Sequence, residues 1–188
     1  DTPAGTVSVP PGSFFQVNPG CAAILVNTVA AIINECQPST VIDLYCGSAL
    51  FGVTAVRHGV PRIIGLELDS AATAAAEYNL KNAGAEDFKI ITGNAGKLFK
   101  EIQDSFEPDS SLMICDPPRT GMEKSVLSGI CNSRVRHLAY ISCSPDTLCR
   151  DLRFLTRHGY RVQSSQLIDM FPRTPHFETI SRLTRDDG

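Results

Sequence analysis

The residues with the clearest chemical potential are one cysteine and two carboxylates, each beside an apolar run of the sequence. Cys143 follows such a run and comes two residues before Pro145, which favours the first turn of a helix. The helix dipole, with any nearby arginine, would lower the thiol pKa from about 8.5 toward neutrality. Asp116 ends another run, and the two prolines behind it stiffen the turn. Glu178 opens the last run, where a carboxylate could act as a base.

Each of these residues also has a purely structural explanation. A single cysteine is most often a buried packing residue, and Glu178 alone could equally be a surface acid. The block Asp116-Pro117-Pro118-Arg119 is harder to explain in this way, because a turn rarely needs an acid, two prolines and an arginine together. The block therefore favours a functional turn, and the position of Cys143 at the end of a run favours a nucleophile.

A second set of residues could hold a nucleotide-like cofactor. Gly47 follows an apolar run and supplies a tight turn, so that backbone amides of the next helix face a ligand. Glu67 comes 20 residues later, the place of a carboxylate that holds ribose hydroxyls. Asn94 follows a third run, where its amide could contact an adenine or simply shape a turn. Ala49 stands where the GxGxxG pattern has its second glycine, so the turn alone is a weak signal.

These residues lie at the junctions of alternating strands and helices. The hydrophobic periodicity predicts helices over 19–35, 50–58, 70–83, 95–103, 124–131 and 145–158, and strands over 40–45, 62–67, 88–92, 111–116, 137–142, 160–168 and 177–184. We expect Ser70 to cap its helix. Apolar strands without alternation indicate a doubly wound α/β domain, its parallel sheet covered by helices on both faces. Two successive strands at the end indicate that the last one is antiparallel.

Length and composition indicate one globular domain. The chain has 188 residues, of which 43% are hydrophobic and 20% charged, with no apolar run long enough to span a bilayer and no signal peptide. Its seven cysteines form no CxxC pair, which argues against a disulfide framework and a zinc site, so we expect no metal and a cytoplasmic location. We expect residues 1–35 to be an extension that packs on a domain over 36–188.

The net charge of −3 is unevenly distributed. Residues 1–116 hold 6 Lys/Arg against 13 Asp/Glu, a balance of −7, and residues 117–188 hold 11 against 7, a balance of +4. A basic second half could face a polyanion, or its arginines could simply lie on solvated helix faces. Charge alone leaves both explanations open.

Taken together, the motifs resemble the RNA uridine-5-methyltransferases, the S-adenosylmethionine-dependent family that makes 5-methyluridine in tRNA and ribosomal RNA. The matching segments are SFFQVN (13–18), DLYCGSALFG (43–52), GLELD (65–69), GN (93–94), DPPRTGM (116–122), ISCSPDTLCRDL (141–152) and DMFPRTPHFE (169–178). They run in the family's order over nearly the whole chain. The resemblance implies a Rossmann-like class I methyltransferase fold and S-adenosylmethionine as the cofactor.

The resemblance also implies roles for individual residues. Cys143 matches the family's nucleophile and Glu178 its general base. The matches to cofactor-binding positions are Gln16, Tyr45, Gly47, Glu67, Asn94 and Asp116. The family's first turn usually has a second glycine and then an asparagine that touches the cofactor, and this chain has Ala49 and Leu50 there. That departure puts one cofactor contact in doubt.

Two other functions remain open at this stage. RNA cytosine-5-methyltransferases carry a second cysteine directly after the proline of the fourth-strand motif, where this chain has Pro118 or Arg119 and has Cys115 before the aspartate instead. A non-catalytic RNA-binding module would explain the altered cofactor turn. We expect a monomeric catalytic part of a longer protein, without the family's amino-terminal RNA-binding domain, acting on RNA rather than at a membrane. The DMFPRT wording favours ribosomal RNA over tRNA.

Overall fold

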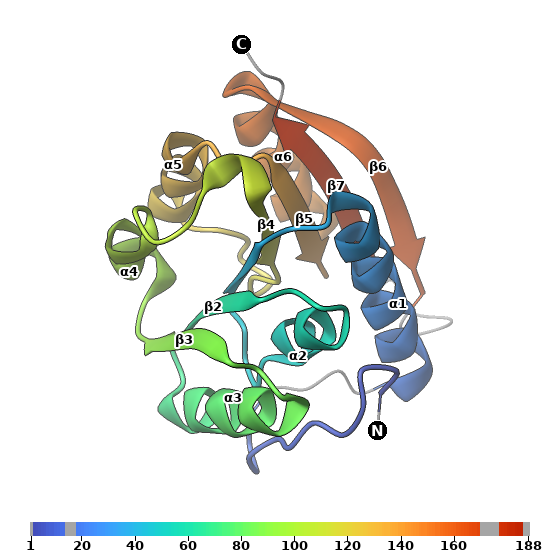
Figure 1. Cartoon of the computed structure of the whole chain (residues 1–188). Helices are drawn as coiled ribbons and strands as arrows, with labels where there is room; N and C mark the ends of the chain where they lie inside the picture. Colours follow the sequence, from blue (N-terminus) through green and yellow to red (C-terminus); the bar gives the residue numbers. More distant parts are fainter. Residues whose placement is uncertain (1, 14–17, 170–176, 186–188) are drawn as a thin grey trace.

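The computed structural model describes residues 2–13, 18–169 and 177–185, and these form a three-layer α/β sandwich (Figure 1). The seven strands of its sheet are arranged in the order β3-β2-β1-β4-β5-β7-β6. Their bounds are β1 (Thr40–Leu44), β2 (Arg62–Glu67), β3 (Asp87–Thr92), β4 (Ser111–Cys115), β5 (His137–Ser142), β6 (Tyr160–Ile168) and β7 (Glu178–Arg185). Strands β1 to β5 are mutually parallel, and β7 is antiparallel to both of its neighbours.

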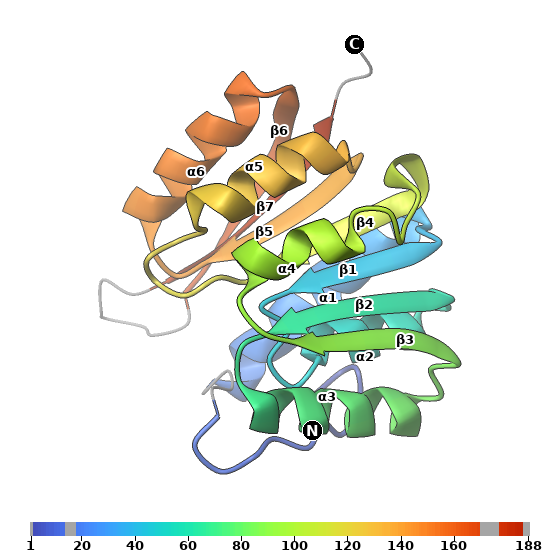
Figure 2. The ribbon, with the colours of Figure 1, turned by 90° about the vertical axis from the view of Figure 1, so that its left-hand side faces the viewer.

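Helices of the described residues cover both faces of the sheet, as Figure 2 shows from the side. One face carries α1 (Pro19–Cys36), α2 (Leu50–Arg57) and α3 (Ser70–Ala83), and the other carries α4 (Ala95–Ile102), α5 (Lys124–Ser133) and α6 (Pro145–Arg157). A short 3-10 helix, Pro108–Ser110, precedes β4. Each layer has its own hydrophobic cluster, so the sheet is buried on both sides at its centre.

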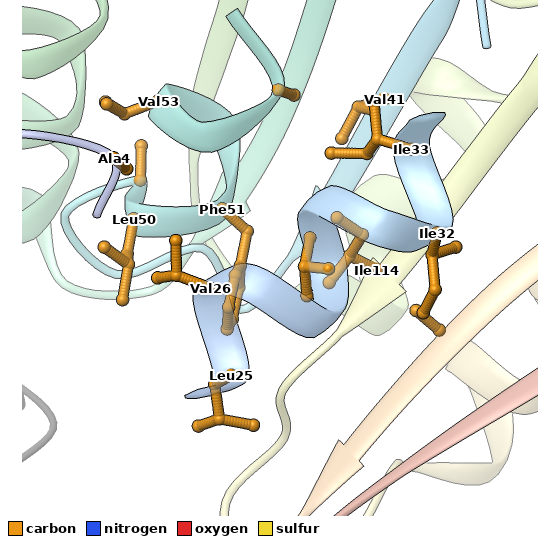
Figure 3. Packing of buried hydrophobic residues seen from close by; sticks show 14 of the residues in the cluster. Ala4, Leu25, Val26, Ile32, Ile33, Val41, Leu50, Phe51, Val53 and Ile114 are labelled. Carbon is orange, nitrogen blue, oxygen red and sulfur yellow. The ribbon is translucent and has the colours of Figure 1, made fainter. Parts of the chain in front are cut away.

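Burial explains why the strand sequences are apolar without alternation. Every residue of β1 and of β4 is buried, because helices cover both faces of these central strands. Helix α1 presents Leu25, Val26 and Ile33 to the core, and Figure 3 shows Val26 near Phe51 of α2 and Ile33 beside Val41 of β1. The extension before β1 thus contributes to the same core as α2, while the domain boundary at residue 35 stays a prediction.

The predicted fold class is confirmed, and the element bounds differ from the expected ones by one or two residues. The predicted cap of α3 is wrong: Asp69 is the N-cap, and its carboxylate accepts the amide of Ala71 at 2.9 Å. Ser70 is already the first helical residue and therefore cannot cap the helix. Among the described residues, no helix is long and apolar enough to cross a membrane.

Candidate active site

The candidate residues lie at one edge of the sheet because of its topology. The carboxyl ends of parallel strands share one edge of the sheet. Four candidate residues lie at or directly after strands that end there: Tyr45, Glu67, Asp116 and Cys143. Strand β7 runs the other way, and its first residue, Glu178, reaches the same edge from the opposite direction. Figure 2 shows this edge at the left of the sheet, where the arrowheads of β2 and β3 point.

Strand register brings the predicted nucleophile and base together. Ser142 pairs with Thr179 in the antiparallel ladder between β5 and β7, so Cys143 and Glu178 are the next residues at the end of that ladder. Glu178 is 6% exposed, and its Oε2 has no hydrogen-bond partner among the described residues. An unpaired carboxylate oxygen beside a thiol has its lone pairs available for a proton.

The Cys143 thiol is half-buried, and its pKa is raised rather than lowered. Burial is the main cause, followed by the negative charge of Glu178, while Arg119 acts in the opposite direction. The sequence-based expectation of a lowered pKa was therefore wrong, because burial, together with the carboxylates of Glu178 and Asp116, outweighs the arginine. The thiol becomes a better nucleophile when these negative charges are neutralised.

The pKa values of the Asp116 and Glu178 carboxyl groups are both raised. Burial raises the pKa of Asp116 from 3.8 to about 7, and the charge of Glu178 adds to the increase. Burial likewise raises the pKa of Glu178 from 4.5 to about 7, and Arg119 moderates this increase. A carboxyl with a pKa near 7 can take up and release a proton at physiological pH, which is the requirement for general acid–base work.

Arg119 belongs to the site although no role was predicted for it. Its positive charge favours the ionised forms of both Cys143 and Glu178. The DPPR block contained this signal, since an arginine fixed behind two prolines is held near the strand end that carries Asp116.

Two side chains of α6 clamp the loop that carries Arg119. Asp151 is fully buried and accepts hydrogen bonds from the Tyr140 hydroxyl at 2.7 Å and from the amide of Met122 at 2.9 Å. Arg150 donates from Nε to Asp151 at 2.8 Å and from Nη2 to the carbonyls of Thr120 and Met122 at 3.1 and 3.2 Å. The loop after β4 is therefore fixed to the helix that follows Cys143.

The clamp explains the glycine within the loop and extends to the arginine itself. The Thr147 hydroxyl donates to the carbonyl of Arg119 at 3.2 Å. A Cβ on Gly121 would lie 2.6 Å from Arg150 Nη2 and 2.7 Å from Asp151 Oδ2, and φ at this position is +74°. Glycine is therefore required for the loop to approach α6 this closely. The contact joins the motifs DPPRTGM (116–122) and ISCSPDTLCRDL (141–152), and no local pattern in either motif predicts it.

Glu67 organises the turn on the cofactor side. Its Oε2 accepts the amide of Gly47 at 2.9 Å, and its Oε1 accepts the amides of Leu68 and Asp69 at 2.6 and 2.9 Å. A carboxylate has about four lone-pair positions, so three are used and one remains for a ligand hydroxyl. The link between Glu67 and Gly47 joins the ends of β1 and β2 into one surface.

The turn after β1 contains two strained non-glycine residues. Tyr45 has φ of +65° and Ala49 has φ of +62°, both in the left-handed region that disfavours side chains. Burial raises the Tyr45 pKa far above its usual value, so its hydroxyl stays protonated. Strain of this kind is common where a backbone is shaped for a ligand. Ala49 is the N-cap of α2, and its left-handed conformation is one that glycine adopts without strain.

Two predicted cofactor residues are placed differently from the rest. The Asn94 side chain caps α4 by accepting the amide of Lys97 at 3.1 Å, and it donates to Glu123 at 2.9 Å. Both of its polar atoms are therefore engaged in local structure, so a cofactor contact would have to compete with them. Gln16 lies outside the described residues.

Asp43 is a buried carboxyl that sequence reasoning passed over. It is fully buried in β1, and neither of its side-chain oxygens has a hydrogen-bond partner among the described residues. Burial raises its pKa well above the usual value, with further contributions from the charges of Asp116 and Glu67. Its position inside the DLYCG motif was the available signal. The carboxyl groups of Asp116 and Glu67 thus act on the proton affinity of Asp43 near the carboxyl ends of β1, β2 and β4.

The architecture is that of the Rossmann-like, S-adenosylmethionine-dependent methyltransferases. The tRNA (uracil-54, C5)-methyltransferase of Pyrococcus abyssi, solved in complex with S-adenosyl-L-homocysteine, superposes with a TM-score of 0.76 at 27% identity, over 93% of this chain and 41% of that one. The putative RNA methyltransferase PH1948 of Pyrococcus horikoshii, at 16% identity and a TM-score of 0.71, covers 98% of this chain and 96% of that one and shares the fold.

The sequence comparisons define the family. The model of the tRNA (uracil-5-)-methyltransferase family matches residues 7–186, and this chain belongs to that family, as the motif resemblance indicated. An uncharacterized RNA methyltransferase of Clostridium tetani is 36% identical over 95% of the chain. The 23S rRNA (uracil(747)-C(5))-methyltransferase RlmC of Shewanella oneidensis is 32% identical over 94% of the chain. The chain spans only 38% and 44% of these two proteins.

Proposed function

We propose that this chain is the catalytic part of an RNA methyltransferase that transfers a methyl group to carbon 5 of uridine. The observation that carries the proposal is the register between β5 and β7, which sets Cys143 beside Glu178 in a member of this family. A thiol and a carboxylate with a pKa near 7 are the two groups that the reaction needs.

S-adenosylmethionine fits the residues at the ends of β1, β2 and β4. Glu67 has one lone-pair position left for a ribose hydroxyl, and Gly47, which Glu67 holds, leaves its turn open. The unpaired, buried carboxyl of Asp43 and the nearby Asp116 favour a cationic ligand. We assign cofactor contacts to Tyr45, Gly47, Glu67 and Asp116, with Asn94 and Gln16 as further members. When bound, the cofactor supplies an activated methyl group on a positively charged sulfur.

Cys143 acts first on the substrate. Its thiolate forms a bond to carbon 6 of the uracil ring, and the electron pair of the 5,6 double bond moves to carbon 5 and O4 as an enolate. Carbon 5 can then accept the methyl group. The positive charges of Arg119 and of the cofactor both favour the thiolate, which offsets the effect of the two carboxylates.

Glu178 completes the reaction. Its carboxylate takes the proton from carbon 5, the double bond re-forms, and the bond between carbon 6 and sulfur breaks to release the Cys143 thiolate. The pKa of about 7 makes Glu178 a stronger base than an ordinary carboxylate. Because the uracil ring must lie between Cys143 and Glu178, the RNA has to present the uridine unstacked.

The structure favours this reaction over cytosine-5 methylation. That chemistry would need a second cysteine at the site, and Cys115 is fully buried in β4 with its pKa raised well above the usual value by burial and by Asp43. An inert thiol of this kind is a packing residue. All seven cysteines are free, in keeping with the reducing cytoplasm as the location.

For the RNA substrate we favour ribosomal RNA over tRNA. The support is the DMFPRT wording of residues 169–174 and the 32% identity with RlmC of Shewanella oneidensis, which is named for a uridine in 23S rRNA. Mapping 5-methyluridine in RNA from a strain that lacks the full gene tests this choice: loss of the modification from tRNA instead would contradict it.

A covalent-trapping experiment tests the mechanism. The full-length protein is incubated with 5-fluorouridine-substituted RNA and S-adenosylmethionine, and the covalent complex is measured on denaturing gels, because fluorine at carbon 5 blocks the final elimination. We expect Cys143→Ala to form no complex and Glu178→Gln to accumulate one even with ordinary RNA. Cys149→Ala is the matched control, since Cys149 is an exposed cysteine on α6. Adduct formation by Cys143→Ala would refute the proposed nucleophile, and so would loss of the adduct in Cys149→Ala.

A further inference from the structure

The opposite edge of the sheet carries a basic hollow that the proposed function does not use. It has a volume of about 370 Å³ and is formed by β5, β7 and β6 and the residue before β5. Its lining consists of Arg136, His137, Arg161, Arg182 and Arg185 with one glutamine and one threonine. Every lining residue can donate a hydrogen bond, and none is acidic or apolar.

The hollow and the candidate active site lie at the two ends of the same strands. His137 begins β5, and Cys143 follows its last residue. Glu178 begins β7, and Arg185 ends it. Six residues of strand at about 3.3 Å each separate the two ends by roughly 20 Å. The hollow is therefore separate from the candidate active site. Both lie on β5 and β7, which run side by side in Figure 1.

Two nitrogen atoms at the hollow are buried without a hydrogen-bond partner among the described residues, Nδ1 of His137 and Nε of Arg182. Arg182 forms an ion pair with Glu35 and also contacts the sulfur of Cys36. Arg185 donates to the carbonyl of Cys131 at 2.8 Å and stacks over Tyr160. These contacts fix two of the four guanidinium groups in place.

The electrostatics of the hollow point to an anion. Burial and the positive charges of Arg136 and Arg182 lower the pKa of His137 below its usual value. Four arginines around one hollow repel one another, and a bound anion would relieve this repulsion. Guanidinium groups match phosphate oxygens in geometry, because two parallel N–H donors can serve one phosphate.

We propose that this hollow binds a phosphate group of the RNA backbone, at a point remote from the target uridine. This assignment rests on the proposed function for the nature of the polyanion. A backbone phosphate fits better than a base, because four guanidinium groups dominate the lining and it includes no Phe, Tyr or Trp side chain on which a base could stack. Such a contact positions the RNA without reading its sequence. An acidic segment of a protein partner is the competing occupant, and the test separates the two.

The first arm of the test uses inorganic phosphate and the His137 ring. The pKa of His137 is measured by NMR in the full-length protein, with His137→Gln for assignment. We expect phosphate to raise this pKa by about 1, as a nearby opposite charge does. The exposed pair Arg136→Gln/Arg161→Gln should abolish the increase, and Lys89→Gln/Lys100→Gln, which removes two charges elsewhere on the exposed surface, should preserve it. An unchanged pKa in the wild-type protein would overturn the assignment.

The second arm measures RNA affinity as a function of salt. If each of the two arginines neutralises one phosphate of single-stranded RNA, their replacement lowers the slope of log K against log salt by about 1.4, twice 0.7. The lysine pair should leave the slope unchanged. A response to phosphate with no change in the RNA slope would show that the hollow serves another anion and would overturn the proposal. Both arms are independent of covalent adduct formation, so a failure of the proposed mechanism at Cys143 is distinguishable.

The acidic residues Asp186 and Asp187 follow Arg185 in the sequence and lie outside the described residues. The phosphate titration is therefore repeated in the Asp186→Asn/Asp187→Asn variant, which removes both as competing anions. Binding at least as tight as in the wild-type protein supports the hollow as the phosphate site. Loss of binding in this variant would contradict it.

Discussion

The two loops that frame the candidate site are held in different ways. The loop after β4, residues 116–122, is fixed by side chains of another element, chiefly Asp151 of α6. The turn after β1, residues 45–49, is held at separate points of its backbone: Glu67 accepts the Gly47 amide, the Leu66 carbonyl accepts the Cys46 amide, and Asn79 of α3 donates to the Ser48 carbonyl. Its backbone conformations also strain Tyr45. The first arrangement holds the loop that carries the charged side chains of Asp116 and Arg119 in one position. The second leaves amides and one carboxylate position open, as a ligand-binding turn requires.

The largest expected effect comes from breaking the clamp on the β4 loop. Asp151→Ala removes a fully buried acceptor and leaves the Tyr140 hydroxyl and the Met122 amide unpaired. We expect a loss of about 3–5 kcal/mol in the free energy of unfolding, measured by urea denaturation. Asp146→Ala, an exposed aspartate on the same helix, is the control and should cost under about 1 kcal/mol. Equal effects of the two changes would show that the clamp has no special weight.

The next effect concerns pH and the same loop. Because the pKa of Asp116 is about 7 in the folded protein and 3.8 ordinarily, the folded state holds its proton more tightly, and stability falls as pH rises from about 4 to about 7. We expect Asp116→Asn to raise the free energy of unfolding at pH 8 by on the order of 2–4 kcal/mol relative to wild type, with little change at pH 4. Asp109→Asn, an exposed acid, should show no such dependence. A constant difference between pH 4 and pH 8 would contradict the burial of this charge.

A smaller effect is expected on the cofactor side. Glu67→Ala removes an acceptor of three backbone amides and the free position for a ribose hydroxyl. We expect S-adenosylmethionine binding, measured by calorimetry, to weaken by about 1–3 kcal/mol. Glu77→Ala is an exposed control on α3. Unchanged affinity in Glu67→Ala would remove this residue from the cofactor site.

The smallest effect tests the strain in the same turn. Ala49→Gly places the residue that favours a positive φ at a position with φ of +62°. We expect a gain of about 1 kcal/mol in the free energy of unfolding, reduced by the greater freedom of glycine in the unfolded chain. Ala71→Gly in the first turn of α3, where φ is helical, should instead be destabilising. A loss of stability in both variants would show that the turn is not strained at Ala49.

The sequence allowed the fold to be predicted, together with the strand ends that carry the candidate residues, because both depend on local patterns. Apolar runs that end in Glu67, Asp116 and Cys143 indicate strand ends, and parallel strands bring their ends to one edge. The direction of the Cys143 pKa shift could not be obtained in this way, because it depends on the burial of the thiol and on the charge of Glu178, a residue 35 positions away.

The contacts of Asp151 were hidden for a similar reason. The carboxylate of Asp151 lies on the apolar face of the amphipathic helix α6. Its hydrogen-bond partners become apparent only from the packing of α6 against the loop after β4. Asp43 was hidden within an apolar strand. Buried carboxyls of this kind lack a local pattern, since the groups that act on them lie elsewhere in the sequence: Tyr140 and Met122 for Asp151, and Asp116 and Glu67 for Asp43.

The placement of β7 has a consequence for biosynthesis and turnover. This strand lies between β5 and β6, although it follows both in the sequence. Before residues 178–185 are in place, one side of β5 exposes unpaired backbone groups that can join another chain as an aggregation template. Proteolytic removal of residues 178–185 would therefore delete the proposed base, Glu178, and at the same time expose the unpaired edge of β5. Addition of β7 therefore brings the proposed base to the site and pairs the exposed backbone of β5 in one step.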